Sequence, residues 1–299
     1  MYLQELVQDL DGEPGFDQVA VRDRNRVVRT DRVRLIQRPN KALMQLQRRL
    51  LVELRGLGLD LPYATASMPG SSLKGNVLPH RDDRYFYLLD LEGAYGSVTV
   101  ERLAKILGFA DPRLDGLEGG VRTFLSRYCL SERGLLMGGP ASQDLFNIYA
   151  ALLIDDPISE LVTANGWVYT RYLDDLTISS REPITGQDRR NVRSIVTRAG
   201  FAVSHHKSRV LDLAKGPIVI TGIGLEMGGR IFAPRHYLRH LRGLLNLAQQ
   251  GRISAEVMAA KMGAFWAMTE RPLNETEWRL VRSYWKYRDA TRFARRASA

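Results

Sequence analysis

The segment that indicates the fold most clearly is Trp167-Val168-Tyr169-Thr170-Arg171-Tyr172-Leu173-Asp174-Asp175-Leu176-Thr177-Ile178-Ser179-Ser180. Two strand-like segments, residues 167–173 and 176–180, flank the Asp174-Asp175 pair, which predicts a β-hairpin with both carboxylates at its tip. Adjacent carboxylates repel each other. A divalent cation such as Mg²⁺ would offset that repulsion, because it takes hard oxygen ligands. The alternative is a solvated acidic turn.

A second strand-like segment also ends on a carboxylate. It reads Tyr85-Phe86-Tyr87-Leu88-Leu89-Asp90. If both strands belong to one sheet, Asp90, Asp174 and Asp175 meet at one edge of it. Three carboxylates in such an arrangement suit a two-metal phosphoryl-transfer site.

Composition limits the class of protein. The chain has 299 residues and 44% hydrophobic content, enough for a full core and two subdomains. It contains no apolar run long enough for a transmembrane helix, and its N-terminus does not resemble a signal peptide. Cys129 is the only cysteine, so an intrachain disulfide is excluded and a reducing cytoplasm is the expected location.

The positive charge is concentrated in two flanks. The net charge is +10, of which residues 20–55 carry +8 and residues 229–299 carry +9, which leaves −7 for the remainder. Basic flanks around an acidic centre suit a protein that grips a polyanion and holds metal ions between the grips. Solvated helix faces are the alternative explanation for each basic cluster.

Hydrophobic periodicity and turn residues predict the other elements. Two short strands are expected within residues 26–37, separated by Thr30-Asp31, and an amphipathic helix over residues 41–57. Further helices are expected over 99–107, 117–130, 142–154 and 188–199, with strands at 202–204 and 218–225. After Pro234 the pattern changes to three helices, over 237–250, 254–268 and 275–295, so Pro234 is the predicted domain boundary.

In this order the motifs resemble those of bacterial retron-type reverse transcriptases, the group of retron and defence-associated enzymes, over about residues 26–296. The resembling segments are Asn76-Val77-Leu78-Pro79-His80, Leu89-Asp90-Leu91-Glu92-Gly93-Ala94-Tyr95, Gly138-Gly139-Pro140-Ala141-Ser142 with Leu145 and Asn147, Thr170-Arg171-Tyr172-Leu173-Asp174-Asp175-Leu176-Thr177, Gly200-Phe201 with Lys207, and Ile220-Thr221-Gly222. One Asp-Asp turn is weak evidence, whereas six motifs in the family's order are strong.

The resemblance implies an α+β, right-hand polymerase fold. Fingers and palm, an antiparallel sheet flanked by helices, would occupy residues 1–233, and a helical thumb residues 234–299. It also implies an RNA-directed DNA polymerase that synthesises cDNA from a non-coding RNA by two-metal nucleotidyl transfer, in antiphage defence. The implied cofactor is a pair of Mg²⁺ ions, with Mn²⁺ as an alternative. The implied partners are dNTPs, a non-coding template RNA, the RNA–DNA duplex and an effector protein, with no membrane. The sequence does not give the oligomeric state.

The same resemblance assigns the metal ligands. Asp90 and Asp174 would bridge both ions, Asp175 would assist, and the backbone carbonyl of Leu91 would complete the nucleotide-side ion. Asp90, Asp174 and Asp175 are therefore the expected catalytic residues.

Five further residues are expected at the nucleotide. By resemblance, Tyr95 occupies the sugar-selecting position, Gly138 belongs to the turn beside the nucleotide, and Lys207 contacts the triphosphate or protonates pyrophosphate. Arg32 and Arg34 lie two apart on an expected strand, so they point to one face and suit a triphosphate contact. The alternatives are a core aromatic for Tyr95, an exposed edge strand for the arginines and a surface lysine for Lys207.

The chain departs from the family pattern where Leu136-Met137 replaces Pro-Gln and Ser142-Gln143 replaces Ser-Pro. Because the family's Gln borders the incoming nucleotide, Met137 leaves template-independent or protein-directed DNA synthesis open. Two further hypotheses are a non-catalytic RNA-binding scaffold and an enzyme that makes RNA instead of DNA. The three carboxylates argue against the scaffold, and Tyr95 argues against RNA synthesis.

Overall fold

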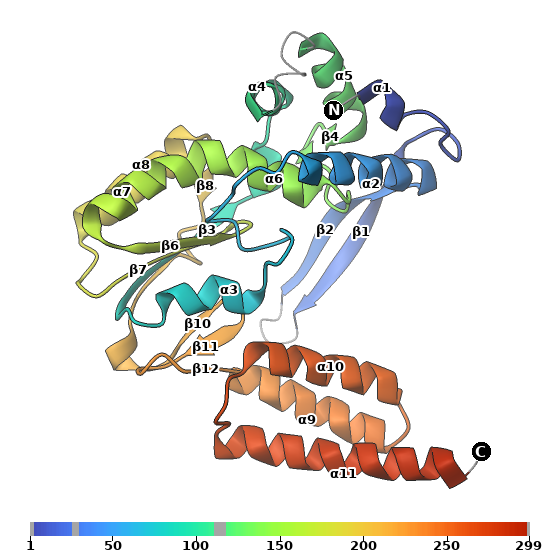
Figure 1. Cartoon of the computed structure of the whole chain (residues 1–299), viewed down its shortest axis with the longest axis vertical. Helices are drawn as coiled ribbons and strands as arrows, with labels where there is room; N and C mark the ends of the chain where they lie inside the picture. The colour runs from blue at the N-terminus through green and yellow to red at the C-terminus, as the bar shows by residue number, and fades with distance from the viewer. Residues whose placement is uncertain (1–2, 26–29, 111–117, 298–299) are drawn as a thin grey trace.

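A computed structural model describes residues 3–25, 30–110 and 118–297 (Figure 1). For Gln4 and for residues 22–25, 30–35, 118–119 and 292–297 it describes the backbone alone. The sheets and the longer helices of the N-terminal part lie together, and three helices form a separate layer at the C-terminal end (Figure 1).

The principal sheet is built around β3 (Tyr85–Glu92). One edge of β3 pairs with β7 (Asp175–Ser180), which pairs in turn with β6 (Val168–Tyr172). The other edge pairs with β9 (Arg209–Asp212) and, further along, with β8 (Ala202–Val203). All these pairings are antiparallel, so the predicted antiparallel sheet is confirmed.

Both faces of this sheet are covered, and alternate residues of β3 serve different cores. Tyr87, Leu89 and Leu91 belong to the main core, together with residues of the helices on that face. Phe86 belongs to a second core with residues of β10 and β11, and Leu88 packs against it. Because side chains alternate along a strand, Asp90 shares the second face with Phe86 and Leu88 and lies at its end.

Helices cover the first face of the sheet. They are α6 (Ser142–Ala150), continued by the π-helical turn η4 (Ala151–Asp155) and α7 (Asp156–Asn165), and α8 (Gly186–Arg198) (Figure 1). A capping box at Thr185 and Asp188 starts α8. The helix α2 (Lys41–Gly56) is capped by Asn40 and buries four leucines at helical spacing, Leu43, Leu46, Leu50 and Leu54.

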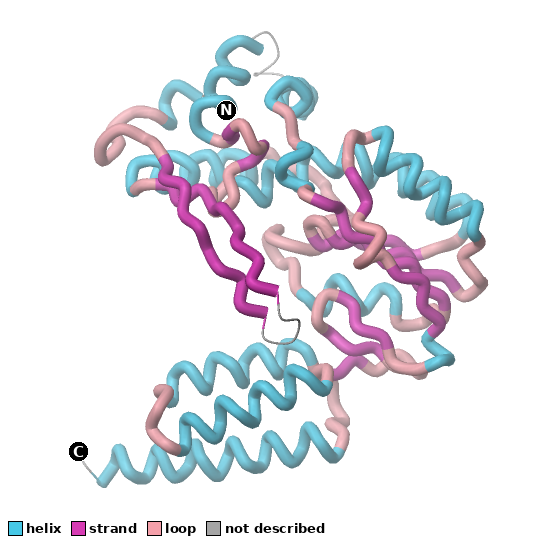
Figure 2. Tube along the Cα trace, turned by 180° about the vertical axis from the view of Figure 1, so that it is seen from behind, coloured by secondary structure: helices cyan, strands magenta, loops and turns pink. Residues whose placement is uncertain are grey.

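A long hairpin of β1 (Phe16–Asn25) and β2 (Thr30–Pro39) extends from this body toward the C-terminal helices (Figures 1 and 2). The prediction of two short strands meeting at Thr30-Asp31 is wrong, because both residues lie inside β2. The predicted first strand, around Val27-Val28, lies outside the described residues. A polar Thr-Asp pair is compatible with an exposed strand, so it did not mark the turn.

The C-terminal helices are α9 (Arg235–Gln249), α10 (Ala255–Met268) and α11 (Glu275–Ala297). Their apolar residues, among them Leu241, Met258, Phe265 and Val281, form a core of their own. Polar contacts tie this layer to the body: Lys74 Nζ donates to the Thr269 carbonyl (2.7 Å), Arg81 pairs with Glu270 (2.7 Å), and Arg230 pairs with Glu277 (3.3 Å).

The remaining described elements are short or lie at the periphery. They are α1 (Leu3–Leu6), α3 (Leu73–Val77), η1 (Leu78–His80), η2 (Ala94–Ser97), α4 (Val100–Ala110), α5 (Glu118–Tyr128), β4 (Leu130–Ser131), β5 (Gly134–Leu135), η5 (Leu213–Lys215), β10 (Ile218–Ile220), β11 (Ile223–Leu225) and β12 (Ile231–Phe232). Among the described residues, no helix combines the length and the apolar character needed to cross a bilayer.

Candidate active site

The register between β3 and β7 places Asp90 directly opposite Asp175. Directly opposed residues of an antiparallel pair have their Cβ atoms about 5 Å apart on the same face of the sheet. Tyr172 also pairs with Asp175, so Leu173 and Asp174 form a two-residue turn between β6 and β7. The Leu91 N–H donates to the Asp174 carbonyl (2.9 Å), which fixes this turn to the end of β3. The structure therefore brings the three predicted carboxylates to one sheet edge.

The backbone of this turn is strained at Leu173. Leu173 has φ of 54°, in the left-handed region that a leucine rarely adopts. A two-residue hairpin turn needs a positive φ to match the twist of its strands, which explains why the strain is there.

The repulsion between carboxylates that the sequence suggested acts on Asp175. Burial, followed by the charges of Asp174 and Asp90, raises the pKa of the Asp175 carboxyl to about 6, while Lys207 opposes the shift. Asp174 and Asp90 are thus close enough to Asp175 to disfavour the ionisation of its carboxyl.

Lys207 is bound to Asp90 in this conformation. Its Nζ donates to both carboxylate oxygens, at 2.8 and 3.1 Å, although the lysine side chain is 59% exposed. The predicted phosphate-side lysine therefore lies at the site, and Asp90 and Asp175 line the same pocket with it. Ser204, at the start of the turn that carries Lys207, donates its N–H to the Asp90 carbonyl (2.8 Å).

A divalent cation would need several oxygen ligands at this edge. Within the described ranges, no group of three His, Cys, Asp or Glu side chains is gathered closely enough to hold a metal ion. Both carboxylate oxygens of Asp90 accept hydrogen bonds from Lys207 Nζ. The donor chemistry nonetheless fits Mg²⁺ or Mn²⁺, because these cations take carboxylate oxygens and would offset the neighbouring charges that raise the pKa of Asp175. The carbonyl of Leu91 as a metal ligand stays a prediction; the residue pairs with Val203 of β8.

Tyr95 lies in η2, just after β3, and its ring packs on Phe146 with centroids 5.4 Å apart. Burial raises the pKa of the Tyr95 hydroxyl, and the charges of Asp174 and Asp144 raise it further, so Asp174 is a near neighbour of Tyr95. The residue is half-buried and keeps part of its surface free. The packing on Phe146 agrees with the core-aromatic alternative, and the sugar-selecting role of Tyr95 stays a prediction.

Gly134 supports Tyr95 and was not singled out from the sequence. It has φ of 85°, and a Cβ there would lie 2.0 Å from the Tyr95 carbonyl oxygen. Only glycine permits this approach of β5 to η2.

Gly138 lies under the long hairpin. It has φ of 126°, and a Cβ there would lie 2.9 Å from the Gln37 carbonyl oxygen of β2. The Gln37 side chain accepts a hydrogen bond from the Met137 N–H (3.0 Å). The structure therefore gives Gly138 a packing role between the hairpin of β1 and β2 and the start of α6, and a contact with nucleotide stays a prediction.

Arg32 and Arg34 both lie on β2, where their backbones pair with Asp23 and Val21. They occupy alternate positions of one strand, as expected. Their side chains lie outside the described part of the structure, so the triphosphate contact stays a prediction.

Asn76 and His80 are fully buried and hydrogen-bonded within the protein. Asn76 donates to the Thr221 hydroxyl (3.0 Å), and the two ring nitrogens of His80 contact Ser179 Oγ (2.6 Å) and Thr170 Oγ1 (2.8 Å). Burial lowers the pKa of the His80 imidazole to about 3. Both residues therefore hold neighbouring segments together through buried hydrogen bonds.

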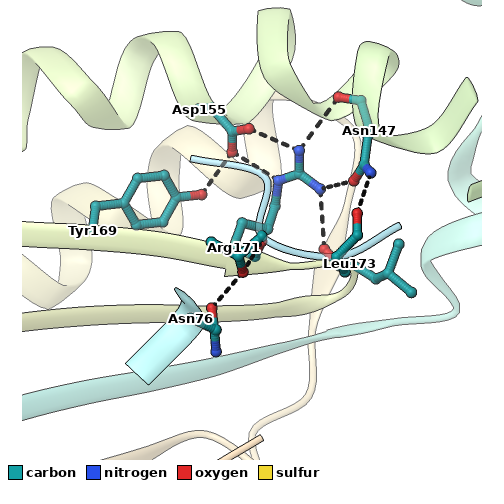
Figure 3. Close-up of polar contacts among 8 residues, drawn as sticks. Asn76, Asn147, Asp155, Tyr169, Arg171 and Leu173 are labelled. Carbon is teal, nitrogen blue, oxygen red and sulfur yellow. Dashed lines mark hydrogen bonds and ion pairs between the residues drawn. The ribbon is translucent and has the colours of Figure 1, made fainter. Parts of the chain in front are cut away.

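Sequence reasoning assigned no role to three buried polar residues behind the hairpin of β6 and β7, although two of them stand in the resembling motifs: Asn147, Asp155 and Arg171 (Figure 3). An arginine inside a strand-like run, and an Asp directly after an apolar helix, are unusual for buried positions and were the available signals.

Residues 21–225 match the family model described as reverse transcriptase (RNA-dependent DNA polymerase). Among curated proteins, the chain is 32% identical over 221 residues to the retron Mx65 reverse transcriptase of Myxococcus xanthus, which covers 66% of this chain and 51% of that protein. It is 25% identical over 237 residues to the retron Ec83 reverse transcriptase of Escherichia coli, covering 76% and 75%. The matched region is thus about half of the Mx65 enzyme.

Solved structures of telomerase share the fold. The Candida albicans enzyme, solved with a fragment of telomeric RNA, aligns with a TM-score of 0.55 at 12% identity, over 93% of this chain and 58% of that one. An apo telomerase from Candida tropicalis, truncated from its C-terminal domain, aligns with a TM-score of 0.52 at 11% identity, over 73% and 55%. Three observations point to the same family. They are the match over residues 21–225, the antiparallel sheet and the carboxylates at its edge. This chain belongs to the reverse transcriptase family, and the curated relatives it resembles are retron enzymes.

Proposed function

We propose that this chain is an RNA-directed DNA polymerase that synthesises cDNA on a non-coding RNA template. The observation that carries the proposal is the register that opposes Asp90 to Asp175, with Asp174 in the adjoining turn. The retron reverse transcriptases among its relatives support the same reaction class. The cytoplasmic location, the effector partner and the role in antiphage defence follow from the resemblance to that group.

The carboxylates of Asp90, Asp174 and Asp175 would hold the divalent ions. Bound there, a pair of Mg²⁺ ions would activate the primer 3′-hydroxyl and neutralise the leaving pyrophosphate. Lys207 would leave Asp90 when that carboxylate takes a metal, and its exposed ammonium would then be free to contact the triphosphate. Tyr95 would exclude a ribose 2′-hydroxyl by the volume of its ring.

The subdomains of the polymerase would correspond to the layers of the fold. Residues 1–233 would form fingers and palm, and residues 234–299 the thumb, which the separate core of α9, α10 and α11 supports. Arg235, Arg239 and Arg242 lie on one exposed face of α9, as expected of a helix that contacts duplex phosphates.

The test is primer extension by the purified chain. A DNA primer annealed to an RNA template is incubated with the four dNTPs and Mg²⁺, beside reactions with rNTPs, with Mn²⁺, with EDTA, and without template. We expect template-complementary DNA only when a divalent ion is present. Asp174→Asn should lower the rate about a thousandfold or more, because metal-held charge accounts for several kcal/mol of transition-state stabilisation.

The parallel reactions distinguish the competing functions. Extension without template would show untemplated synthesis, and products only from rNTPs would show an RNA polymerase. A third outcome is that the wild-type chain binds RNA but extends no primer, and that Mn²⁺ gives no more product with wild type than with Asp174→Asn. This result would identify a scaffold and contradict the proposal.

A further inference from the structure

Arg171 is a fully buried charged side chain in the middle of the catalytic hairpin (Figure 3). It lies in β6, two residues before Leu173. Its main chain is tied to a neighbouring loop, through its N–H to the Tyr63 carbonyl (2.7 Å) and through its carbonyl to the Thr65 N–H (2.8 Å). An unpaired arginine in such a place would be strongly destabilising, so its partners define its role.

All five N–H donors of the Arg171 guanidinium have an acceptor. Nε and Nη2 donate to the two carboxylate oxygens of Asp155, at 2.8 and 2.7 Å. Nη1 donates to Asn147 Oδ1 (3.0 Å) and to the Leu173 carbonyl (3.3 Å), and Nη2 also donates to the Asn147 carbonyl (3.3 Å). A lysine has three donors and no planar fork, so it cannot reproduce this set.

The partners are themselves held in place. Tyr169 donates its hydroxyl to Asp155 Oδ1 (2.7 Å), and Asn147 donates its amide to the Ala66 carbonyl (2.8 Å). The latter bond leaves Asn147 Oδ1 as the acceptor toward Arg171. Although burial alone would lower the pKa of the guanidinium, the charge of Asp155 and its hydrogen bonds raise it, so Arg171 stays charged.

The π-helical turn η4 is what brings Asn147 and Asp155 to the same side. Eight residues separate them, and in a regular α-helix such residues point about 80° apart. A π turn accommodates one extra residue, so the eight residues advance about as far as seven would, which leaves the two side chains only about 20° apart. The irregular turn thus places both residues around the Arg171 guanidinium. Asp155, Asn147 and the Leu173 carbonyl form the socket for Arg171.

The bond to the Leu173 carbonyl reaches the strained residue of the catalytic turn. Leu173 has φ of 54°, and the next two residues are Asp174 and Asp175. A strained conformation persists only when its surroundings hold it. Arg171 supplies this hold from the protein interior, away from the pocket that Asp90 and Asp175 line.

We propose that Arg171, anchored by Asp155 and Asn147, is a positioning residue that fixes the Leu173 turn and so sets the geometry of the metal-binding carboxylates. The proposal deepens the proposed function, because it assumes that these carboxylates hold the divalent ions. Arg171 acts through the main chain of Leu173 and touches neither substrate nor metal.

The test measures metal binding separately from catalysis. Mn²⁺ affinity is determined by titration calorimetry for wild type, Arg171→Lys and Asp155→Asn, and the Mg²⁺ concentration for half-maximal primer extension is measured in parallel. Residues that orient metal ligands typically contribute 10–100-fold to metal affinity. We expect a weakening of that order in both variants, a matching rise in the Mg²⁺ requirement, and little change in the KM for dNTP.

Glu277→Gln is the matched control. Glu277 is also a fully buried carboxylate paired with an arginine, Arg230 at 3.3 Å, but it lies in the C-terminal helical layer. This variant should lose thermal stability while keeping the wild-type affinity for Mn²⁺. Should Arg171→Lys fail to fold, the isosteric Asp155→Asn carries the test alone.

Wild-type Mn²⁺ affinity in a folded but destabilised Asp155→Asn would overturn the proposal and leave Arg171 a purely structural residue. The two proposals can fail separately. If wild type binds Mn²⁺, Asp174→Asn does not, and wild type extends no primer, the polymerase proposal fails. The calorimetric comparison of wild type with Asp155→Asn still decides the role of Arg171.

Discussion

At the level of single side chains, Tyr95 lies between the sheet edge that carries Asp90, Asp174 and Asp175 and the interior of the protein. Its ring packs on Phe146, while Asp174 lies near its hydroxyl. A residue in this position can exclude an extra hydroxyl from the sugar only through the volume of its ring.

Tyr95→Val should therefore reduce the preference for dNTPs over rNTPs by at least about tenfold, because the ring volume that excludes the 2′-hydroxyl is removed. Single-nucleotide incorporation kinetics with dCTP and CTP give the ratio of kcat/KM values. Tyr95→Phe is the control, because it keeps the ring and removes only the hydroxyl. An unchanged ratio in Tyr95→Val would assign Tyr95 to the core instead.

His80 makes the stability of the fold depend on pH. Its pKa is about 3 in the folded chain, because of burial, against 6.5 for an ordinary histidine. Between these values the unfolded chain binds a proton that the folded chain excludes, so stability is complete above pH 6.5 and falls as the pH decreases toward 3. The contribution of His80 to the free energy of unfolding should fall by about 2 kcal/mol between pH 6.5 and pH 5.

Urea unfolding at the two pH values measures this contribution as a difference between wild type and His80→Asn. The variant should be less stable than wild type at pH 6.5 and should show a shallower dependence of stability on pH. His240→Asn, on the exposed face of α9, should keep the wild-type dependence. Equal pH dependences for wild type and His80→Asn would contradict the assignment.

At the level of elements, the site depends on close approaches between segments that are far apart in the sequence. Gly134 of β5 meets the main chain of Tyr95 in η2, and Gly138 meets Gln37 of β2. The sequence marked the turn with Gly138 as a motif but gave no reason to single out Gly134, because the contact exists only after folding.

Gly134→Ala should reduce polymerase activity at least about tenfold, because its Cβ would lie 2.0 Å from the Tyr95 carbonyl and must displace η2. Gly166→Ala is the matched control, with φ of 64° and no atom within 4 Å of its added Cβ. Both variants should lose about 1 kcal/mol or more of stability from the positive φ, measured by thermal unfolding. Only Gly134→Ala should lose activity; equal activities would show that η2 tolerates the displacement.

The same scale shows where sequence patterns are reliable. The helices over residues 41–57 and 254–268 agree with α2 and α10 within a residue at each end, because apolar spacing and the caps Asn40 and Ser254 are local signals. The strands of the long hairpin were misplaced, since alternation along an exposed, charged hairpin is weak and its pairing partner is not visible in the sequence.

At the level of the whole molecule, the basic charge of the C-terminal part lies on helices with their own core. The exposed Arg235, Arg239 and Arg242 share one face of α9. If this layer grips an RNA–DNA duplex through phosphates, binding must weaken with salt in proportion to the contacts made.

The triple substitution of Arg235, Arg239 and Arg242 by Gln should weaken duplex binding, and the slope of log affinity against log salt should decrease by about 2–3. Fluorescence anisotropy with a labelled duplex at several salt concentrations measures both quantities. Arg122, Arg127 and Arg198, exposed on α5 and α8, form a control set of equal charge. An equal loss of slope in both triple variants would indicate a general charge effect and no thumb contact.

The amino-acid pattern alone was enough to predict the hairpin that carries Asp174 and Asp175, the strand that ends at Asp90 and the helical C-terminal part, because each depends on neighbours within a few residues. The register that opposes Asp90 to Asp175, the ion pair of Lys207 with Asp90 and the socket around Arg171 came only from the folded chain. These contacts join residues up to 117 positions apart. Their geometry is fixed by which faces the packed core buries, and a local pattern carries no information about that.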